Sequence, residues 1–92
     1  MYRIEFTAKM RRDAKRMEKR GKDMSKLEIC LDLLASGEKM PDSYGDHPLF
    51  GNRRGNRECH LEPDWILIYR IQKNTLILVA TETGTHADLF GL

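Results

Sequence analysis

The spacing of apolar residues changes early in the chain from every second position to every third or fourth. Tyr2, Ile4 and Phe6 alternate with polar residues, which is the pattern of a short strand with one buried face. Thr7 can cap a helix over residues 8–20, because no glycine or proline interrupts the good helix formers of that stretch. The pattern therefore predicts a strand that leads directly into a helix.

A second helix is predicted after a connection of only a few residues. Asp23 can cap this helix, and Gly37 ends it. Two helices joined so closely form an antiparallel hairpin, which packs its apolar side against another layer. The apolar residues of the second helix recur at three- and four-residue steps: Met24, Leu27, Cys30, Leu31, Leu33 and Leu34.

The second half of the chain predicts a loop and three strands. Residues 38–52 show no periodicity, because two prolines and two glycines interrupt them, and they predict a long loop. Residues 56–61 and 75–83 have the composition of strands. Residues 65–71 (WILIYRI) are almost continuously apolar, which is typical of a central strand. Short turns between these strands favour antiparallel pairing.

These elements predict one domain over residues 1–92 with a small α+β fold. An N-terminal strand and a helical hairpin precede three antiparallel strands, which form one sheet with the helices on one face. The opposite face is left open. The length of 92 residues and the hydrophobic content of 40% fit one modest core. Cys30 and Cys59 form no Cys-x-x-Cys pair, so we expect reduced thiols.

No apolar run approaches the ~20 residues of a membrane span, and the N-terminal stretch turns polar too early for a signal peptide. We therefore expect a cytoplasmic protein without membrane contact. The formal net charge is only +2, but residues 1–26 hold ten basic and four acidic side chains, a balance of +6. Such clustering is typical of nucleic-acid binding, although charged helices are often only solvated. Four cations recur on one side of the first helix as docking candidates: Arg12, Lys15, Arg16 and Lys19.

All three histidines fall in the second half of the chain, at edges or ends of predicted strands. His47 lies in the loop, His60 near the end of a strand, and His86 past the last strand, where Gly84 predicts a flexible exit. Imidazole, with an ordinary pKa of about 6.5, suits acid–base catalysis. No two histidines have the close spacing of a ligand pair, so the sequence predicts no metal site.

Strand alternation relates His60 to its neighbours. Glu58 and His60 share one face of their strand, whereas Arg57 and Cys59 share the other. If Cys59 faces the helices, His60 faces the open side of the sheet.

Other candidates lie beside this strand. Asp64 follows a proline, so a rigid turn sets its direction. Trp65 either fills the core or offers a platform for a substrate. Three arginines are candidates for phosphate contacts, although the last must reach round an edge of the sheet: Arg53, Arg54 and Arg57.

Three blocks of the sequence resemble the YafQ branch of the RelE/ParE superfamily of bacterial toxins. They are residues 46–49 (DHPL), 60–69 (HLEPDWILIY) and 83–90 (TGTHADLF), and their order and spacing match along most of the chain. The resemblance implies a ribosome-dependent messenger RNA endonuclease without a cofactor. It also implies an antitoxin with a ribbon-helix-helix part, through which alone the toxin contacts operator DNA. The functional positions carried over are His47, His60, Asp64, His86 and Phe90, with Trp65 as a less certain member.

The implied chemistry uses the 2′-hydroxyl of the RNA as nucleophile, with a base, an acid and cations around the phosphate. We expect His86 to be the general acid and Asp64, assisted by His60, to be the base. His47 shares that role or holds the phosphate, and Phe90 stacks on a base. Two other functions fit the same fold. A ParE-like inhibitor of DNA gyrase would not cleave RNA, and a plain nucleic-acid-binding module would use only the basic helix.

Overall fold

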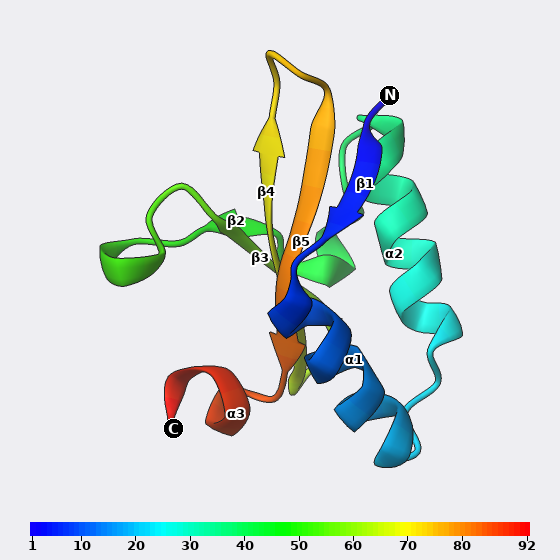
Figure 1. Cartoon of the computed structure of the whole chain (residues 1–92), viewed down its shortest axis with the longest axis vertical. Coiled ribbons are helices and arrows are strands. Elements are labelled where there is room, and N and C mark those ends of the chain that lie inside the picture. The colour runs from blue at the N-terminus through cyan, green and yellow to red at the C-terminus, as the bar shows by residue number, and fades with distance from the viewer.

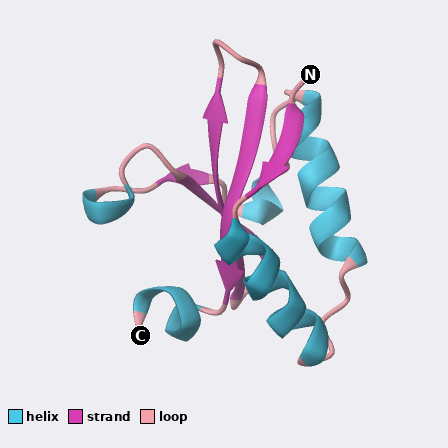
Figure 2. Cartoon of the chain, in the orientation of Figure 1, coloured by secondary structure: helices cyan, strands magenta, loops and turns pink.

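The computed structural model describes all residues, 1–92, as one mixed sheet with helices on both sides (Figures 1 and 2). The α+β class and the N-terminal order of strand and two helices are as predicted. The elements are β1 (Arg3–Phe6), α1 (Ala8–Lys19), α2 (Ser25–Ser36), η1 (Asp42–Tyr44), β2 (His47–Pro48), η2 (Gly51–Arg53), β3 (Arg57–Glu62), β4 (Trp65–Gln72), β5 (Ile77–Gly84) and α3 (His86–Phe90).

The sheet has the strand order β1-β5-β4-β3-β2. Strand β4 is central, as its apolar run predicts, and it pairs antiparallel with β3 and β5. Strand β1 pairs with β5 in parallel, because the two helices carry the chain across one face before β5 is formed. The predicted count of four strands is wrong. Strand β2 lies in the predicted loop, and its two residues are too few to show a period.

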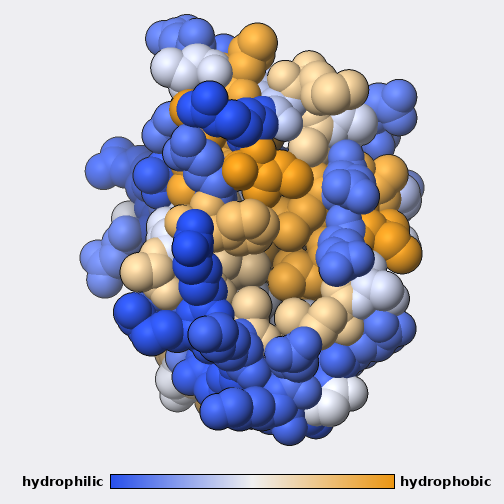
Figure 3. Space-filling model, turned by 45° about the vertical axis from the view of Figure 1, so that its right-hand side comes forward, coloured by the Kyte–Doolittle hydropathy of each residue, from blue (hydrophilic) through white to orange (hydrophobic).

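Helices α1 and α2 cover one face of the sheet, as expected (Figure 1). The main core lies between these two helices and the sheet, and it includes Met10, Met17, Leu31, Trp65 and Leu67. The two cysteines are free and fully buried in this core, with their Sγ atoms 3.4 Å apart. Figure 3 turns this side forward and shows apolar side chains that reach the surface between hydrophilic ones. No helix in the chain has the length and apolar character that a membrane crossing requires.

The beginnings of the two helices differ in one detail. Thr7 caps α1 as predicted, because its hydroxyl accepts a hydrogen bond from the Met10 amide. Helix α2 begins one residue later than expected, with Met24 at the cap position. The Asp23 carboxylate still accepts hydrogen bonds from the amide and hydroxyl of Ser25. These bonds hold the pKa of Asp23 below its ordinary value.

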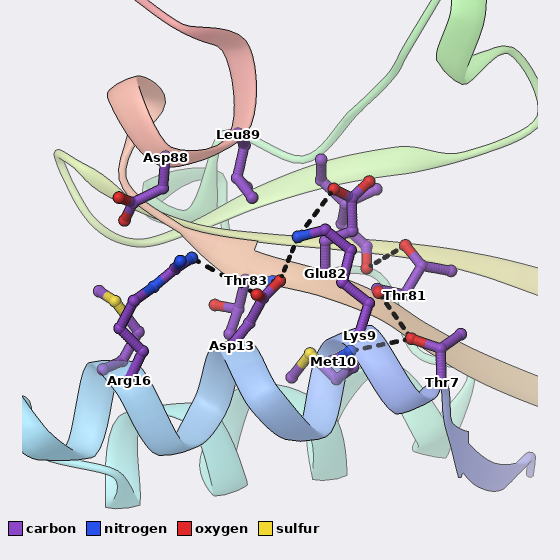
Figure 4. A network of polar contacts seen from close by, with 12 residues as sticks. Thr7, Lys9, Met10, Asp13, Arg16, Thr81, Glu82, Thr83, Asp88 and Leu89 are labelled. Carbon is purple, nitrogen blue, oxygen red and sulfur yellow. Dashed lines mark hydrogen bonds and ion pairs between the residues drawn. The ribbon is translucent and has the colours of Figure 1, made fainter.

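Helix α1 completes the edge of β5 where β1 ends (Figure 4). Strand β1 pairs with β5 only as far as Ala80. Beyond it, the Thr7 hydroxyl donates to the Thr81 carbonyl at 2.7 Å, and the Asp13 carboxylate accepts from the Thr83 amide at 3.2 Å. These side chains satisfy backbone groups that an uncovered strand edge would leave unpaired. Asp13 is therefore buried on the covered side of α1, together with Met10 and Met17.

Candidate active site

The face opposite α1 and α2 is only partly open. Helix α3 and the segment around η2 lie on this side of the sheet (Figure 1). Beneath them, Ile66, Ile68 and Leu89 form a second, small buried cluster. The remaining part of the face carries the three histidines around the side chain of Glu58, which is only 8% exposed. The expectation that His60 faces away from the helices is confirmed, because Cys59 lies in the main core.

Four rings form a row across this face. The ring centres of His47 and His60 are 6.3 Å apart, those of His60 and His86 are 5.9 Å apart, and those of His86 and Phe90 are 6.2 Å apart. The rings come from β2, β3 and the two ends of α3. Residues that are up to 43 positions apart in the sequence therefore line one surface.

Backbone carbonyls orient His47 and His60. The Nδ1 atom of His47 lies 2.8 Å from the Gly45 carbonyl, and that of His60 lies 3.1 Å from the Tyr44 carbonyl. A carbonyl oxygen can only accept a hydrogen bond, so both Nδ1 atoms carry the proton. A side chain at Gly45 would place its Cβ 3.2 Å from His60 Nδ1, at a φ of +56°. The loop thus needs glycine there to approach the imidazole.

The free nitrogens of these two rings turn toward Glu58. The Nε2 atom of His47 is 3.0 Å from one carboxylate oxygen of Glu58, and the Nε2 atom of His60 is 3.6 Å from the other. These two distances are those of ion pairs when the imidazoles are protonated, so the Glu58 carboxylate can balance positive charge on either ring.

Asp64 orients His86. One oxygen of its carboxylate accepts hydrogen bonds from the backbone amide and from Nδ1 of His86, at 2.9 and 2.6 Å. These bonds stabilise the carboxylate and hold the pKa of Asp64 below its ordinary value. They leave Nε2 of His86 free on the open face, 3.9 Å from Glu58. Asp64 therefore lies beside His86, whereas the carboxylate beside His60 is that of Glu58.

The expected flexible exit at His86 is wrong. His86 is the first residue of α3, and the preceding Thr85 caps this helix in a reciprocal pair of hydrogen bonds with Asp88. Helix α3 has only five residues, too few to show a helical period beside the strand that precedes it. The Ser/Thr-x-x-Asp pattern of residues 85–88 was the one available signal for it.

Glu58 is the residue of the site to which sequence reasoning gave no role. Strand alternation places it on the face of His60, but it does not show that β2 and α3 bring two more imidazoles to the same carboxylate. Glu58, His60 and His86 also offer ligand atoms within 4.8 Å of one another. One carboxylate and two imidazoles form a donor set that suits a transition metal ion. Spacing along the chain could not reveal this set, because it spans two elements.

The three candidate arginines are separated by the fold. Arg53 lies on the open face, where its guanidinium donates to the Leu89 carbonyl at 2.8 Å and lies 4.7 Å from the centre of the Phe90 ring. Arg54 is exposed next to it. Arg57 lies on the other side of the sheet, where it bonds to Asp46 at 2.8 Å. Arg57 is therefore not near the histidines.

Trp65 belongs to the core. Its ring is fully buried with the residues beneath α1 and α2, and its indole N–H donates to the Thr83 hydroxyl at 2.9 Å. It offers no surface for a substrate. The candidate docking residues Arg12, Lys15 and Lys19 are exposed on α1, and Arg16 bonds to Asp13 at 3.4 Å.

The fold and this site together define a small RelE-like toxin. The family described as "Bacterial toxin of type II toxin-antitoxin system, YafQ" matches residues 2–91. The chain belongs to this YafQ family of toxins. The mRNA interferase toxin YafQ of Escherichia coli K12 is 45% identical over 89 residues, which cover 96% of this chain and 95% of the relative.

Solved structures agree with this assignment. The crystal structure of YafQ from E. coli BL21(DE3) is 41% identical, with a TM-score of 0.91 over 99% of this chain and 100% of that one. The E. coli DinJ–YafQ complex contains a chain that is 42% identical, with a TM-score of 0.90 and the same coverage. A metal-bound toxin from Helicobacter pylori is 38% identical, with a TM-score of 0.92 over 98% of this chain and 100% of that one.

Proposed function

We propose that this protein is an endoribonuclease that cleaves messenger RNA on the ribosome and so inhibits translation. The observation that carries the proposal is the convergence of the His47, His60 and His86 Nε2 atoms on the buried carboxylate of Glu58. Membership of the YafQ family supports it, as does the E. coli relative that is called an mRNA interferase. The place of action is the cytoplasm, where ribosomes translate messenger RNA.

The reaction is attack of the RNA 2′-hydroxyl on the adjacent phosphate. The hydroxyl is already held beside the phosphorus, which removes most of the entropic cost of bringing a nucleophile to it. A base takes the hydroxyl proton, and an acid protonates the 5′-oxygen as it leaves. The products are a 2′,3′-cyclic phosphate and a 5′-hydroxyl. DNA lacks the nucleophile and is not cleaved.

His86 is the general acid. Asp64 holds Nδ1 of its ring, so that a proton on Nε2 points to the open face of the sheet. A carboxylate whose pKa is held below its ordinary value is a weak base, so the observed bonds support Asp64 as the residue that orients His86. An imidazole that donates a hydrogen bond to a carboxylate through one nitrogen and reacts through the other is a recurrent catalytic arrangement.

The base is the pair of His60 and Glu58, and His47 shares that role or holds the phosphate. The Nε2 of His60 carries no proton in the neutral ring, because Nδ1 is committed to the Tyr44 carbonyl. It can therefore accept the proton of the 2′-hydroxyl. Glu58 balances the positive charge that then develops on the imidazole, at 3.6 Å. This arrangement replaces the expected pairing of Asp64 with His60.

Phe90 and Arg53 bind the RNA beside the reacting phosphate. The Phe90 ring ends the row of rings and can stack on a base, which is how proteins commonly hold single-stranded RNA. Arg53 holds this end of α3 and adds positive charge, and Arg54 contributes a second cation at the surface. The cations of α1 provide the docking surface for ribosomal RNA: Arg12, Lys15, Arg16 and Lys19.

The partner that neutralises this toxin is an antitoxin of the ribbon-helix-helix type, through which the pair binds operator DNA. The E. coli relative has been solved in a toxin–antitoxin complex with DinJ, which supports an antitoxin partner. The DNA-gyrase alternative has no feature of the site in its favour, because protein binding does not need three oriented imidazoles around one carboxylate.

The experiment is cleavage of messenger RNA on programmed ribosomes, with the new ends mapped chemically. We expect 5′-hydroxyl ends, equal activity after the toxin is treated with a chelator and returned to ribosomes in magnesium buffer, and no effect on gyrase supercoiling. A 5′-phosphate end would contradict the mechanism. Binding to ribosomes without any new ends would favour the plain RNA-binding module.

A further inference from the structure

We propose that Arg20 and Asp88 form a clamp that positions the catalytic His86 by holding the start of α3 against α1. Both are positioning residues, because neither reaches the open face itself. This inference rests on the proposed function only through the role of His86.

Helix α3 is too short to be stable by itself. It has five residues, whereas isolated helices shorter than about 12–15 residues are only marginally stable in water, so its position depends on contacts with the rest of the fold. It nevertheless carries His86 at its start and Phe90 at its end. Whatever fixes α3 therefore fixes two members of the row of rings.

Asp88 joins two sets of contacts at the start of α3. Its carboxylate accepts a hydrogen bond from the Thr85 amide at 2.9 Å, and its own amide donates to the Thr85 hydroxyl at 3.1 Å. The same carboxylate accepts hydrogen bonds from both terminal guanidinium nitrogens of Arg20, at 2.6 and 3.1 Å. A bidentate arginine–carboxylate pair restricts orientation as well as distance. Asp88 thus connects the cap of α3 to the end of α1.

The end of β5 supports the same position. A Cβ atom at Gly84 would lie 2.9 Å from Cβ of Asp88, which is closer than such atoms approach. Only glycine lets the Asp88 side chain lie directly against this strand. Asp88 is therefore confined between Gly84 and Arg20, and its side chain is only 15% exposed.

The opposite end of α3 has its own support. Arg53 donates to the Leu89 carbonyl, and Glu82 holds the Arg53 guanidinium at 3.2 and 3.3 Å. The loss of Arg20 should therefore not unfold α3 but let its start move. Because His86 is the first residue of the helix, this movement changes its distance to the RNA phosphate. A misplacement of about 1 Å can cost roughly a hundredfold in rate.

The experiment compares three variants, Arg20→Gln, Arg20→Lys and Asp88→Asn, with the double variant Arg20→Gln/Asp88→Asn. The matched control is Arg3→Gln, which loses the same charge from an exposed residue of β1. Single-turnover cleavage on ribosomes gives the maximal rate and the ribosome concentration for half of it. Amide hydrogen exchange of residues 85–90 by NMR reports the mobility of α3 without any assay of activity.

We expect each single variant to lower the maximal rate by about tenfold and to speed exchange in α3, with little change in half-saturating ribosome concentration or melting temperature. The double variant should be no slower than the slower single one, since both break one interaction. Arg20→Lys keeps the charge but loses the bidentate geometry, so its maximal rate should fall as well. A loss confined to the half-saturating ribosome concentration would assign the effect to ribosome binding and overturn the clamp. The clamp would also be overturned if the unmodified toxin cleaves and Arg20→Gln shows the same exchange in α3 and the same maximal rate. A parent that does not cleave while α3 exchange still rises would contradict the proposed function alone.

Discussion

Single atoms decide the chemistry of this site, because each imidazole has one nitrogen bound and one free. Tyr44 and Gly45 carbonyls hold two of the Nδ1 atoms, and Asp64 holds the third. All three Nε2 atoms consequently face the same carboxylate. The three imidazoles therefore differ in what holds their Nδ1 atom, a carboxylate for His86 and a carbonyl for His47 and His60.

Replacement of His86 by Ala should lower the single-turnover cleavage rate by about 10² to 10⁴, the usual effect of losing a general acid. The side chain is 36% exposed, so little core volume is lost and the fold should survive. Circular dichroism checks the fold, and His47→Ala is the comparison, with a smaller loss expected because that residue shares its role. A parental rate in His86→Ala would refute the acid assignment.

Replacement of Glu58 by Gln should lower cleavage by about tenfold to a hundredfold, because the amide has nearly the same shape but cannot balance the charge on His60. Ribosome binding should be unchanged, since Glu58 is buried. Glu38→Gln, at an exposed position outside the site, is the matched control. If Glu58→Gln cleaves as fast as the parent, the imidazoles work without their shared carboxylate.

At the scale of the elements, segments outside the three long strands complete the sheet edge and place two of the three histidines. Helix α1 satisfies the edge of β5 and presents cations to solvent on its other side. Strand β2 consists of two residues, yet it pairs His47 directly with Glu58. Helix α3 adds His86 and covers two isoleucines. Each of these elements therefore serves both the fold and the site.

Reversal of the exposed cations Arg12, Lys15 and Lys19 to Glu should weaken ribosome binding without slowing cleavage at saturating ribosomes. Each phosphate contact that is lost should lower the slope of log affinity against log salt by about one. Binding titrations at several salt concentrations measure this slope. An unchanged affinity and slope would show that these cations form only a solvated face.

The start of α2 predicts a pH dependence of stability. The pKa of Asp23 is held down first by hydrogen bonds from Ser25. A folded-state pKa below the unfolded value of about 3.9 stabilises the protein above that value, and this stabilisation is lost as the pH falls through the folded-state pKa. Asp23→Ala should therefore be less stable than the parent at neutral pH, with a difference that shrinks below about pH 4. Urea unfolding across this range tests it, and a constant difference would contradict it.

At the scale of the whole molecule, the sheet separates two faces with different tasks. One face carries the helices and the main core, and the other carries the row of rings. Apolar side chains remain exposed on the molecule, among them Phe6 and Ile29 near the helices and Phe50 beyond β2. These side chains are accessible to a partner on the folded chain.

Binding of the antitoxin should raise the melting temperature of the toxin, because a ligand that binds only the folded state stabilises it. The gain is about 2.7 kcal/mol when free antitoxin exceeds its dissociation constant by about a hundredfold. Scanning calorimetry of the free toxin and of the purified pair measures the difference. Equal melting temperatures would contradict a partner that recognises the folded chain.

The sequence by itself determined four main elements and proposed most of the residues that line the candidate site. Periods of two and of three to four residues located β1, α1, α2 and the central strand β4, because these patterns depend on neighbours along the chain. Alternation along β3 placed His60 on the face away from the helices. The resemblance to known toxins selected the three histidines, Asp64 and Phe90.

Only the tertiary structure decided how these residues work together. The two-residue strand β2, the parallel pairing of β1 with β5 and the short helix α3 leave no period in the sequence. The pairing of Asp64 with His86, the place of Glu58 among three imidazoles and the distance of Arg57 from them depend on contacts between distant segments. Local patterns report which face of an element is buried, but they do not report which other element meets it.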